Sequence, residues 1–166
     1  MQATVPNGAD PEATGWRVKA ASRKDVAAIV TAVTELLSEL GGTAPAPDAM
    51  ETAARELIDN CDAGALLVAE ADGALVGVLA ASWQTAIHVP GRYALIQDLW
   101  VDEAWRSQAI GAGLLAALFE LAGEWGVDRV EVGLPRETFT AIGATQAFYE
   151  RNGFSPLGPR MRRVLP

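Results

Sequence analysis

The strongest constraint on the fold is a change in hydrophobic period partway along the chain. Residues 26–40 and 48–61 space their apolar side chains at intervals of three and four, as amphipathic helices do. Residues 65–84 instead form two apolar runs joined by Asp72-Gly73, a strong hairpin signal, and residues 92–103 form a third run. Two helices followed by three consecutive strands predict an antiparallel meander.

The first helix has clear signals at both ends. Ser22 and Asp25 have the spacing of a capping box, and Gly41 and Gly42 follow the last apolar position. A proline-rich break then leads to Asp48, which is expected to cap the second helix. Because Cys61 falls on the apolar stripe of that helix, it is expected to be a core residue.

The remaining segments complete the predicted order of elements. A first strand is expected at residues 16–22, a helix within residues 104–126, a strand at 128–134, a helix at 138–153 and a last strand at 160–165. The fold class is therefore α+β, an α/β three-layer sandwich with a mixed central sheet flanked by helices. Residues 1–15 lack periodicity and are expected to form a mobile tail, leaving 16–166 as one domain.

Composition narrows the classes of partner. The net charge of −8 argues against nucleic-acid binding, which depends on Lys and Arg at phosphates. No apolar stretch approaches the roughly 20 residues of a membrane helix, and the N-terminus lacks the features of a signal peptide. A single cysteine excludes an internal disulfide and a cysteine-based metal cage. We expect a cytoplasmic protein with no metal and no membrane partner.

Residues 104–113 place small side chains just before an apolar helix. The first turn of a helix has unpaired N–H groups and a partial positive charge, so a bare backbone there can bind an anion. Arg106 adds a planar guanidinium that can pair with a phosphate. The alternative is an Ala/Gly-rich helix packed closely on strands, and spacing alone does not separate the two. The pattern is neither a Walker loop nor a dinucleotide fingerprint.

Two stretches resemble a known family. Residues 95–115, LIQDLWVDEAWRSQAIGAGLL, contain Gln108-x-x-Gly111-x-Gly113, which resembles the acyl-CoA-binding motif of the GNAT superfamily of N-acetyltransferases. Residues 147–154, AFYERNGF, resemble the second signature of that family near its C-terminus. The predicted order of elements also matches the GNAT fold from residue 16 onward.

The resemblance implies that the chain transfers an acetyl group from acetyl-CoA to an amine of a small molecule or peptide, by direct attack on the thioester. Backbone groups of Leu99, Trp100 and Val101 would pair with the pantetheine arm where two strands splay. The pyrophosphate would be held by Arg106, Ser107, Gln108, Ala109, Ile110, Gly111, Ala112 and Gly113. Tyr149 would protonate the leaving thiolate; the competing interpretation is a core tyrosine.

The general base departs from the family pattern. Several relatives that acetylate polyamines carry Glu where this chain has Gln97, and glutamine cannot accept a proton. Asp98 is the favoured base, although successive side chains of a strand are expected to point to opposite faces. The alternatives are that Asp98 works through a water, that it is structural, that Glu103 or Glu131 serves, or that the amine arrives neutral.

Two further positions depart from the pattern of the relatives. Ile142 stands where many relatives have an asparagine that touches the cofactor, and Ala109 stands where they often have glycine. One side-chain contact with the cofactor is therefore lost, and one methyl group is added near the phosphates.

The acceptor site is expected between the first two helices, the hairpin region and residues 85–92. Gln97 belongs to it, and Trp83 and Trp100 are candidates for an aromatic wall, although core packing is commoner for such residues. His88 is a further candidate, with a solvated loop histidine as the alternative. A homodimer is expected on the resemblance alone. The competing function is a CoA-binding module without catalysis, which the missing glutamate at position 97 keeps open.

Overall fold

A computed structural model describes residues 15–165, so nearly all of the expected N-terminal tail lies outside the described residues. The chain divides into two compact units, the first ending at Val132 and the second beginning at Gly133. Each unit is described by itself. The prediction that residues 16–166 form one domain remains a prediction.

The first unit is built on a five-stranded mixed sheet in the order β1-β2-β3-β4-β5. The strands are β1 (Arg17–Ala20), β2 (Gly64–Ala71), β3 (Ala74–Ala86), β4 (Val89–Val101) and β5 (Val130–Val132). The first four are antiparallel and β5 runs parallel to β4. Asp72 and Gly73 form the turn between β2 and β3 with positive φ at both positions, as the hairpin signal predicts. The predicted meander and mixed sheet are confirmed.

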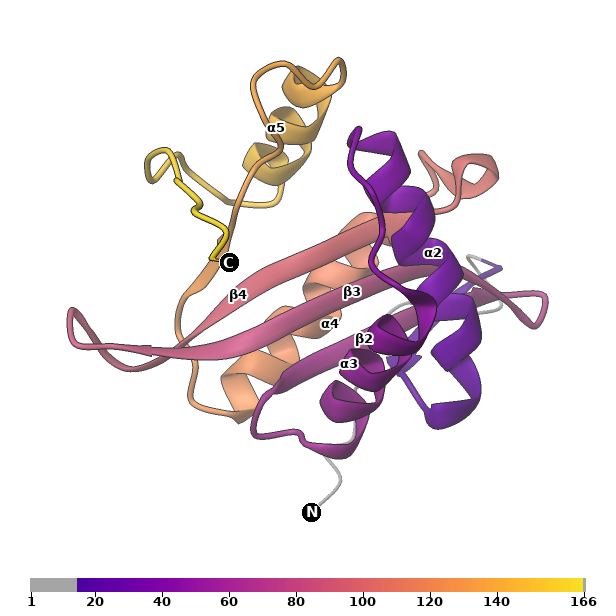
Figure 1. Cartoon of the computed structure of the whole chain (residues 1–166). Helices are drawn as coiled ribbons and strands as arrows, with labels where there is room; N and C mark the ends of the chain where they lie inside the picture. Colours follow the sequence, from indigo (N-terminus) through magenta and orange to yellow (C-terminus); the bar gives the residue numbers. More distant parts are fainter. Residues whose placement is uncertain (1–14, 166) are drawn as a thin grey trace. The chain divides into compact units, whose positions relative to one another are not determined.

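Helices cover both faces of this sheet (Figure 1). They are α2 (Val26–Glu39), α3 (Pro47–Asp59) and α4 (Ile110–Glu124). On one face, Val26, Ile29 and Ala32 of α2 share a buried cluster with Val78 and other strand residues. On the opposite face lies α4, and a Cβ on Gly77 of β3 would lie 3.0 Å from Ile110 and 3.1 Å from Leu114 of that helix, closer than ordinary van der Waals contact. The two faces can therefore be assigned residue by residue.

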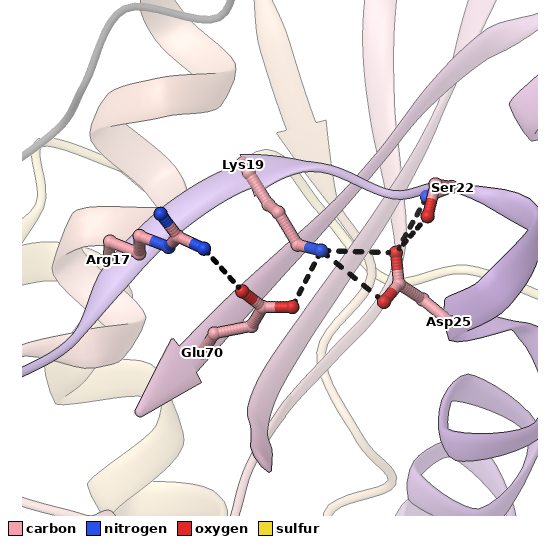
Figure 2. Close-up of polar contacts among 5 residues, drawn as sticks. All are labelled: Arg17, Lys19, Ser22, Asp25 and Glu70. Atoms are coloured by element: carbon pink, nitrogen blue, oxygen red, sulfur yellow. Dashed lines mark hydrogen bonds and ion pairs between the residues drawn. The ribbon is translucent and has the colours of Figure 1, made fainter. Parts of the chain in front are cut away.

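A cluster of five polar residues fixes the start of α2 against the sheet (Figure 2). The capping box is formed: the Ser22 N–H and hydroxyl both donate to Asp25 Oδ2, at 2.8 and 2.7 Å. Lys19 Nζ lies 3.3 Å from Asp25 and 2.6 Å from Glu70, which also pairs with Arg17 at 3.2 Å. Two cations and two carboxylates balance, so the cluster has a structural role.

The prediction for Cys61 is wrong. The helix α3 ends at Asp59, and Asn60 leaves the helical conformation with φ −125° and ψ 85°. Cys61 therefore leaves the apolar stripe and is exposed. Its carbonyl oxygen accepts a hydrogen bond from Trp83 Nε1 at 2.9 Å.

The second unit contains one helix, α5 (Ile142–Arg151), shorter than the expected 138–153. No strand forms in residues 133–165, so the expected last strand is absent. The apolar side chains of that run, Met161, Val164 and Leu165, are all exposed. Nothing buries them, and the physical condition for a half-buried strand is not met.

Candidate active site

The centre of β4 contains a β-bulge. Asp98 lies opposite Ala80 of β3 and Ile96 lies opposite Ala81, so Gln97 is an extra residue with no partner on β3. A bulge interrupts the alternation of side chains along a strand. Regular alternation of the side chains of Gln97 and Asp98, expected from the sequence, does not hold here.

As a consequence, the side chains of Gln97 and Asp98 lie on the same face of the sheet. Gln97 Nε2 donates to the Ser82 hydroxyl at 2.9 Å, and Gln84 Nε2 donates to the same oxygen at 2.8 Å. Ser82 lies two residues beyond Ala80, which is packed on the face covered by α2 and α3. A short row of uncharged polar groups therefore lies on the face of the sheet that carries Asp98, and Gln97 is the member of the row next to Asp98.

Asp98 lines a cavity of about 260 Å³ between α2, α3 and the sheet. The other described residues that line it are all apolar, including Ile29 of α2, Ala54 of α3 and Leu66 of β2. Burial in these surroundings raises the pKa of the Asp98 carboxyl, and no described residue forms a hydrogen bond or ion pair with it. A desolvated carboxylate without a partner holds a proton more readily, which is the property of a general base.

Beyond the bulge, one edge of β4 is open. The strand β5 pairs only with Ala94, Leu95 and Ile96, and no other described strand pairs with that edge over residues 97–101. The residues expected to hold pantetheine, Leu99, Trp100 and Val101, occupy this stretch. At an open edge, the backbone N–H and C=O groups that do not point to β3 can pair with an extended ligand arm, and the Val101 carbonyl among them already accepts a hydrogen bond from Arg106 Nε. Their role as ligand contacts stays a prediction.

Trp100 has a second property of interest. Its side chain is 6% exposed and packs with Val26, Ile29 and Ala32 of α2, yet its Nε1 is buried and has no hydrogen-bond partner among the described residues. Such an unpaired buried donor costs stability. We have no structural explanation for it.

The loop after β4 leads into an uncapped helix N-terminus. Ser107 and Ala109 adopt left-handed backbone, with φ of 65° and 61°, and no side chain caps α4. The N–H of Gly113 donates to the Ala109 carbonyl at 2.9 Å, as the first regular bond of the helix. The N–H groups of residues 110–112 precede it and are therefore the ones free to hold an anion.

Gly113 leaves room for a neighbouring aromatic side chain, and its N–H is already used in the first hydrogen bond of α4. A Cβ on it would collide with the indole of Trp16. Trp16 is 4% exposed, and its Nε1 donates to the Gln108 carbonyl at 3.0 Å. This hydrogen bond stabilises the loop before α4. Sequence reasoning missed Trp16. The available signal was an isolated tryptophan just before the first strand, but its contact lies 92 residues away along the chain.

Arg106 is not a free cation in this structure. Its Nε donates to the Val101 carbonyl at 3.0 Å, and its NH2 group lies 2.6 Å from Glu39 Oε1 at the end of α2. Both side chains are over two-fifths exposed, and exposed pairs are weak. A phosphate could therefore exchange with Glu39 at little cost.

The two tryptophans considered for an aromatic wall are core residues, which is the interpretation that the sequence favours. Trp83 lies 8% exposed with its ring 6.5 Å from Trp125, directly after α4. Trp100 packs on α2, so the two tryptophans lie on opposite faces of the sheet. His88 is exposed in the turn between β3 and β4, roughly 30 Å of strand away from Asp98. Of the candidate acceptor residues, only Gln97 lies beside Asp98.

Tyr149 lies on α5 in the second unit. Its ring is 8% exposed and makes edge contacts with Phe148 and Phe154, at 5.1 and 5.3 Å between centroids. Burial raises the pKa of its hydroxyl to about 12, so the phenol is protonated at neutral pH, as a general acid must be. The aromatic packing also fits a core tyrosine, and both interpretations remain.

No helix within residues 15–165 is long and apolar enough to cross a membrane. In the same residues, no group of His, Cys, Asp and Glu side chains has the arrangement of a metal site.

One family model matches most of the chain. Residues 31–154 match the model of the acetyltransferase (GNAT) family. No curated protein sequence matches the chain at a significant level.

Solved structures share the fold. A possible acetyltransferase from Clostridium difficile 630 has a TM-score of 0.76 and 16% identity, covering 91% of this chain and 97% of that one. Glucosamine-6-phosphate N-acetyltransferase from Arabidopsis thaliana has a TM-score of 0.72 and 15% identity, with coverages of 91% and 99%. The aminoglycoside N-acetyltransferase AAC(6')-Iy in complex with CoA has a TM-score of 0.74 and 16% identity, with coverages of 97% and 98%. At these identities the likeness establishes the fold.

Proposed function

The chain belongs to the GNAT acetyltransferase family, and from that premise we propose that it transfers the acetyl group of acetyl-CoA to a primary amine by direct attack on the thioester. The observation that carries the proposal is the arrangement after the β4 bulge. An open strand edge at residues 97–101 leads within ten residues to an uncapped helix N-terminus. One extended ligand with an anionic end fits both features.

The residues present fit acetyl-CoA as the donor. The open edge at Leu99, Trp100 and Val101 would pair with the pantetheine arm, and the N–H groups of residues 110–112 would hold the pyrophosphate. Arg106 would leave Glu39 for a phosphate oxygen. The AAC(6')-Iy structure contains CoA, which supports the same donor here.

The chemistry follows from two desolvated groups. Asp98 accepts a proton from the incoming ammonium, directly or through a water, and frees the lone pair on nitrogen. The nitrogen bonds to the thioester carbonyl carbon, the C–S bond breaks, and the sulfur leaves as a thiolate. By the family resemblance, Tyr149 of the second unit gives that thiolate its proton. The nitrogen loses its second proton as the C–S bond breaks, and that proton replaces the one given by Tyr149. The products are an amide, free CoA and the proton held by Asp98.

A second candidate, the CoA-binding module without catalysis, rests on Gln97. That residue has no ionisable group, and its amide is bound to Ser82. Asp98 on the same face weakens this candidate, because the bulge places a carboxylate beside Gln97. A homodimer and a cytoplasmic location remain predictions from the resemblance and the composition.

Calorimetric titration with acetyl-CoA tests the donor site. The wild type should bind, and Gly111→Trp, which fills the first turn of α4, should not. Ala116→Trp on the exposed side of the same helix is the matched control and should bind as the wild type does. No binding by a folded wild type would overturn the proposal. Binding without CoA release from any amine would favour the non-catalytic module.

A further inference from the structure

We propose that the acceptor is a primary amine attached to a compact apolar body, and that the cavity lined by Asp98 selects this class against polyhydroxylated and polycationic amines. The proposal rests on the proposed acetyl transfer and names its substrate class.

The walls of the cavity supply the first argument. Apart from Asp98, the described lining residues are apolar and come from four elements around it, with Val33, Leu37, Met50 and Leu57 among them. When the apolar surface of a ligand moves from water to such walls, binding becomes more favourable in proportion to the area buried. A hydroxyl or second ammonium placed there finds no hydrogen-bond partner on the walls.

The polar groups on the same face of the sheet as Asp98 supply the second argument, although Asp98 is the one among them that lines the cavity. Gln97 and Gln84 both use their amide N–H groups on the Ser82 hydroxyl, which leaves their carbonyl oxygens as acceptors. These oxygens and the Asp98 carboxylate all favour a donor with positive charge. The site therefore favours a ligand with one cationic end and a body that needs no polar contacts.

The size of the cavity supplies the third argument. The cavity of about 260 Å³ has room for a five- or six-carbon amine. Each hydroxyl of a multi-ring sugar amine that is buried there without a partner would lower affinity by roughly tenfold or more.

Three amines with the same five-carbon chain test the selection. They are 1-aminopentane, 5-aminopentan-1-ol and 1,5-diaminopentane, which differ only in carrying a hydrogen, a hydroxyl or an ammonium on the far carbon. Thiol release from acetyl-CoA by the full chain gives kcat/KM for each. We expect 1-aminopentane to exceed the alcohol by about tenfold or more, with the diamine lower still. Equal values, or a preference for the alcohol or the diamine, would overturn the proposal.

Two variants on α3 tie the selection to the cavity. Ala53 lines the cavity yet is exposed, so Ala53→Phe should narrow it without disturbing the core. It should lower kcat/KM for 1-aminopentane about tenfold and leave KM for acetyl-CoA unchanged. Ala49→Phe, on the same helix but outside the lining, should change neither. An unchanged kcat/KM in Ala53→Phe would contradict the assignment.

The outcomes separate this inference from the function on which it rests. If acetyl-CoA neither binds nor releases CoA with any amine, the acetyltransferase proposal fails and the inference falls with it. If CoA is released but the polar amines are preferred, only the inference fails.

Discussion

Two carboxylates on the first unit lie in opposite electrostatic surroundings. Asp25, at the start of α2, is 9% exposed, and burial by itself would raise its pKa. The hydrogen bonds from Ser22 and the charge of Lys19 outweigh that effect and lower the pKa (Figure 2). Asp98 is also withdrawn from water, but nothing offsets its burial and its pKa is raised.

The difference separates a structural carboxylate from a reactive one. A buried charge that is fully paired stabilises the local fold and has no remaining capacity to act on a ligand. A desolvated charge without partners costs stability, and that cost is tolerated where a reaction needs a base. Replacing each residue should therefore damage a different property.

The largest effect is expected from Asp98→Asn. Removal of the base should lower kcat/KM for amine acetylation by about 100-fold or more, the ordinary contribution of general-base catalysis. Because the ionised form is disfavoured by burial, the neutral variant should unfold at the same temperature or a higher one. Steady-state kinetics and thermal melting measure the two properties. A variant with normal turnover would remove Asp98 from the mechanism.

Tyr149→Phe should have the next largest effect. Loss of the phenol proton should lower kcat by about tenfold or more, with KM for acetyl-CoA changed far less. The ring packing against Phe148 and Phe154 is retained in this variant. Single-turnover measurement of thiol release gives the rate. An unchanged rate would leave Tyr149 as a core residue only.

Asp25→Asn should have the opposite profile to Asp98→Asn. The amide cannot pair with Lys19 as the carboxylate does, and the capping box is weakened, so stability should fall by about 1 to 3 kcal/mol. Turnover per folded molecule should stay normal. Urea unfolding and kinetics at a permissive temperature check both. Lost turnover in the folded variant would mean that the cluster is coupled to the site.

The free energy of unfolding should depend on pH in the acid range because of the paired carboxylates. The pKa of Glu70 is lowered, chiefly by its bond to Lys19, and that of Asp25 is lowered as well. Their contribution is full above the unfolded value of about 4 and disappears as pH falls through the lower folded values. Urea midpoints between pH 6 and 2 should therefore fall in that acid range. In Asp25→Asn the fall should be smaller.

The smallest effect is expected from Arg23→Ala. The guanidinium pairs with Asp59 at 2.6 Å, but both side chains are largely solvated. Exposed pairs are screened by water and salt. We expect no resolvable change in melting temperature. A clear drop would show that an exposed ion pair contributes to stability without being buried.

Local signals were sufficient for much of the fold. The capping box at Ser22, the hairpin turn at Asp72-Gly73 and the helical period after Ile110 all depend on neighbours within a few residues, and all three are confirmed. The last strand failed because pairing requires a distant partner that the sequence does not identify. Cys61 failed because a single change of backbone conformation at Asn60 ended the helix.

The site could be predicted in part. The small residues before α4 indicated the helix N-terminus, since its physical basis is local. The bulge at Gln97 arises from the register between β3 and β4, and the sequence of either strand alone does not specify that register. The contact of Trp16 with the loop at Gln108 is likewise long-range. Both features decide how the site is built, and both needed the tertiary structure.

The central claim is that Asp98 is the base of an amine acetyltransferase, and the pH dependence of kcat/KM tests it most directly. The wild type and Asp98→Asn would be measured with the same amine, so that titration of the substrate is common to both. The pKa of the Asp98 carboxyl is raised above the ordinary value of about 3.9. Wild-type kcat/KM should therefore fall as the pH drops through this raised pKa. The same fall should be absent from Asp98→Asn. The same acidic limb in both proteins would contradict the account.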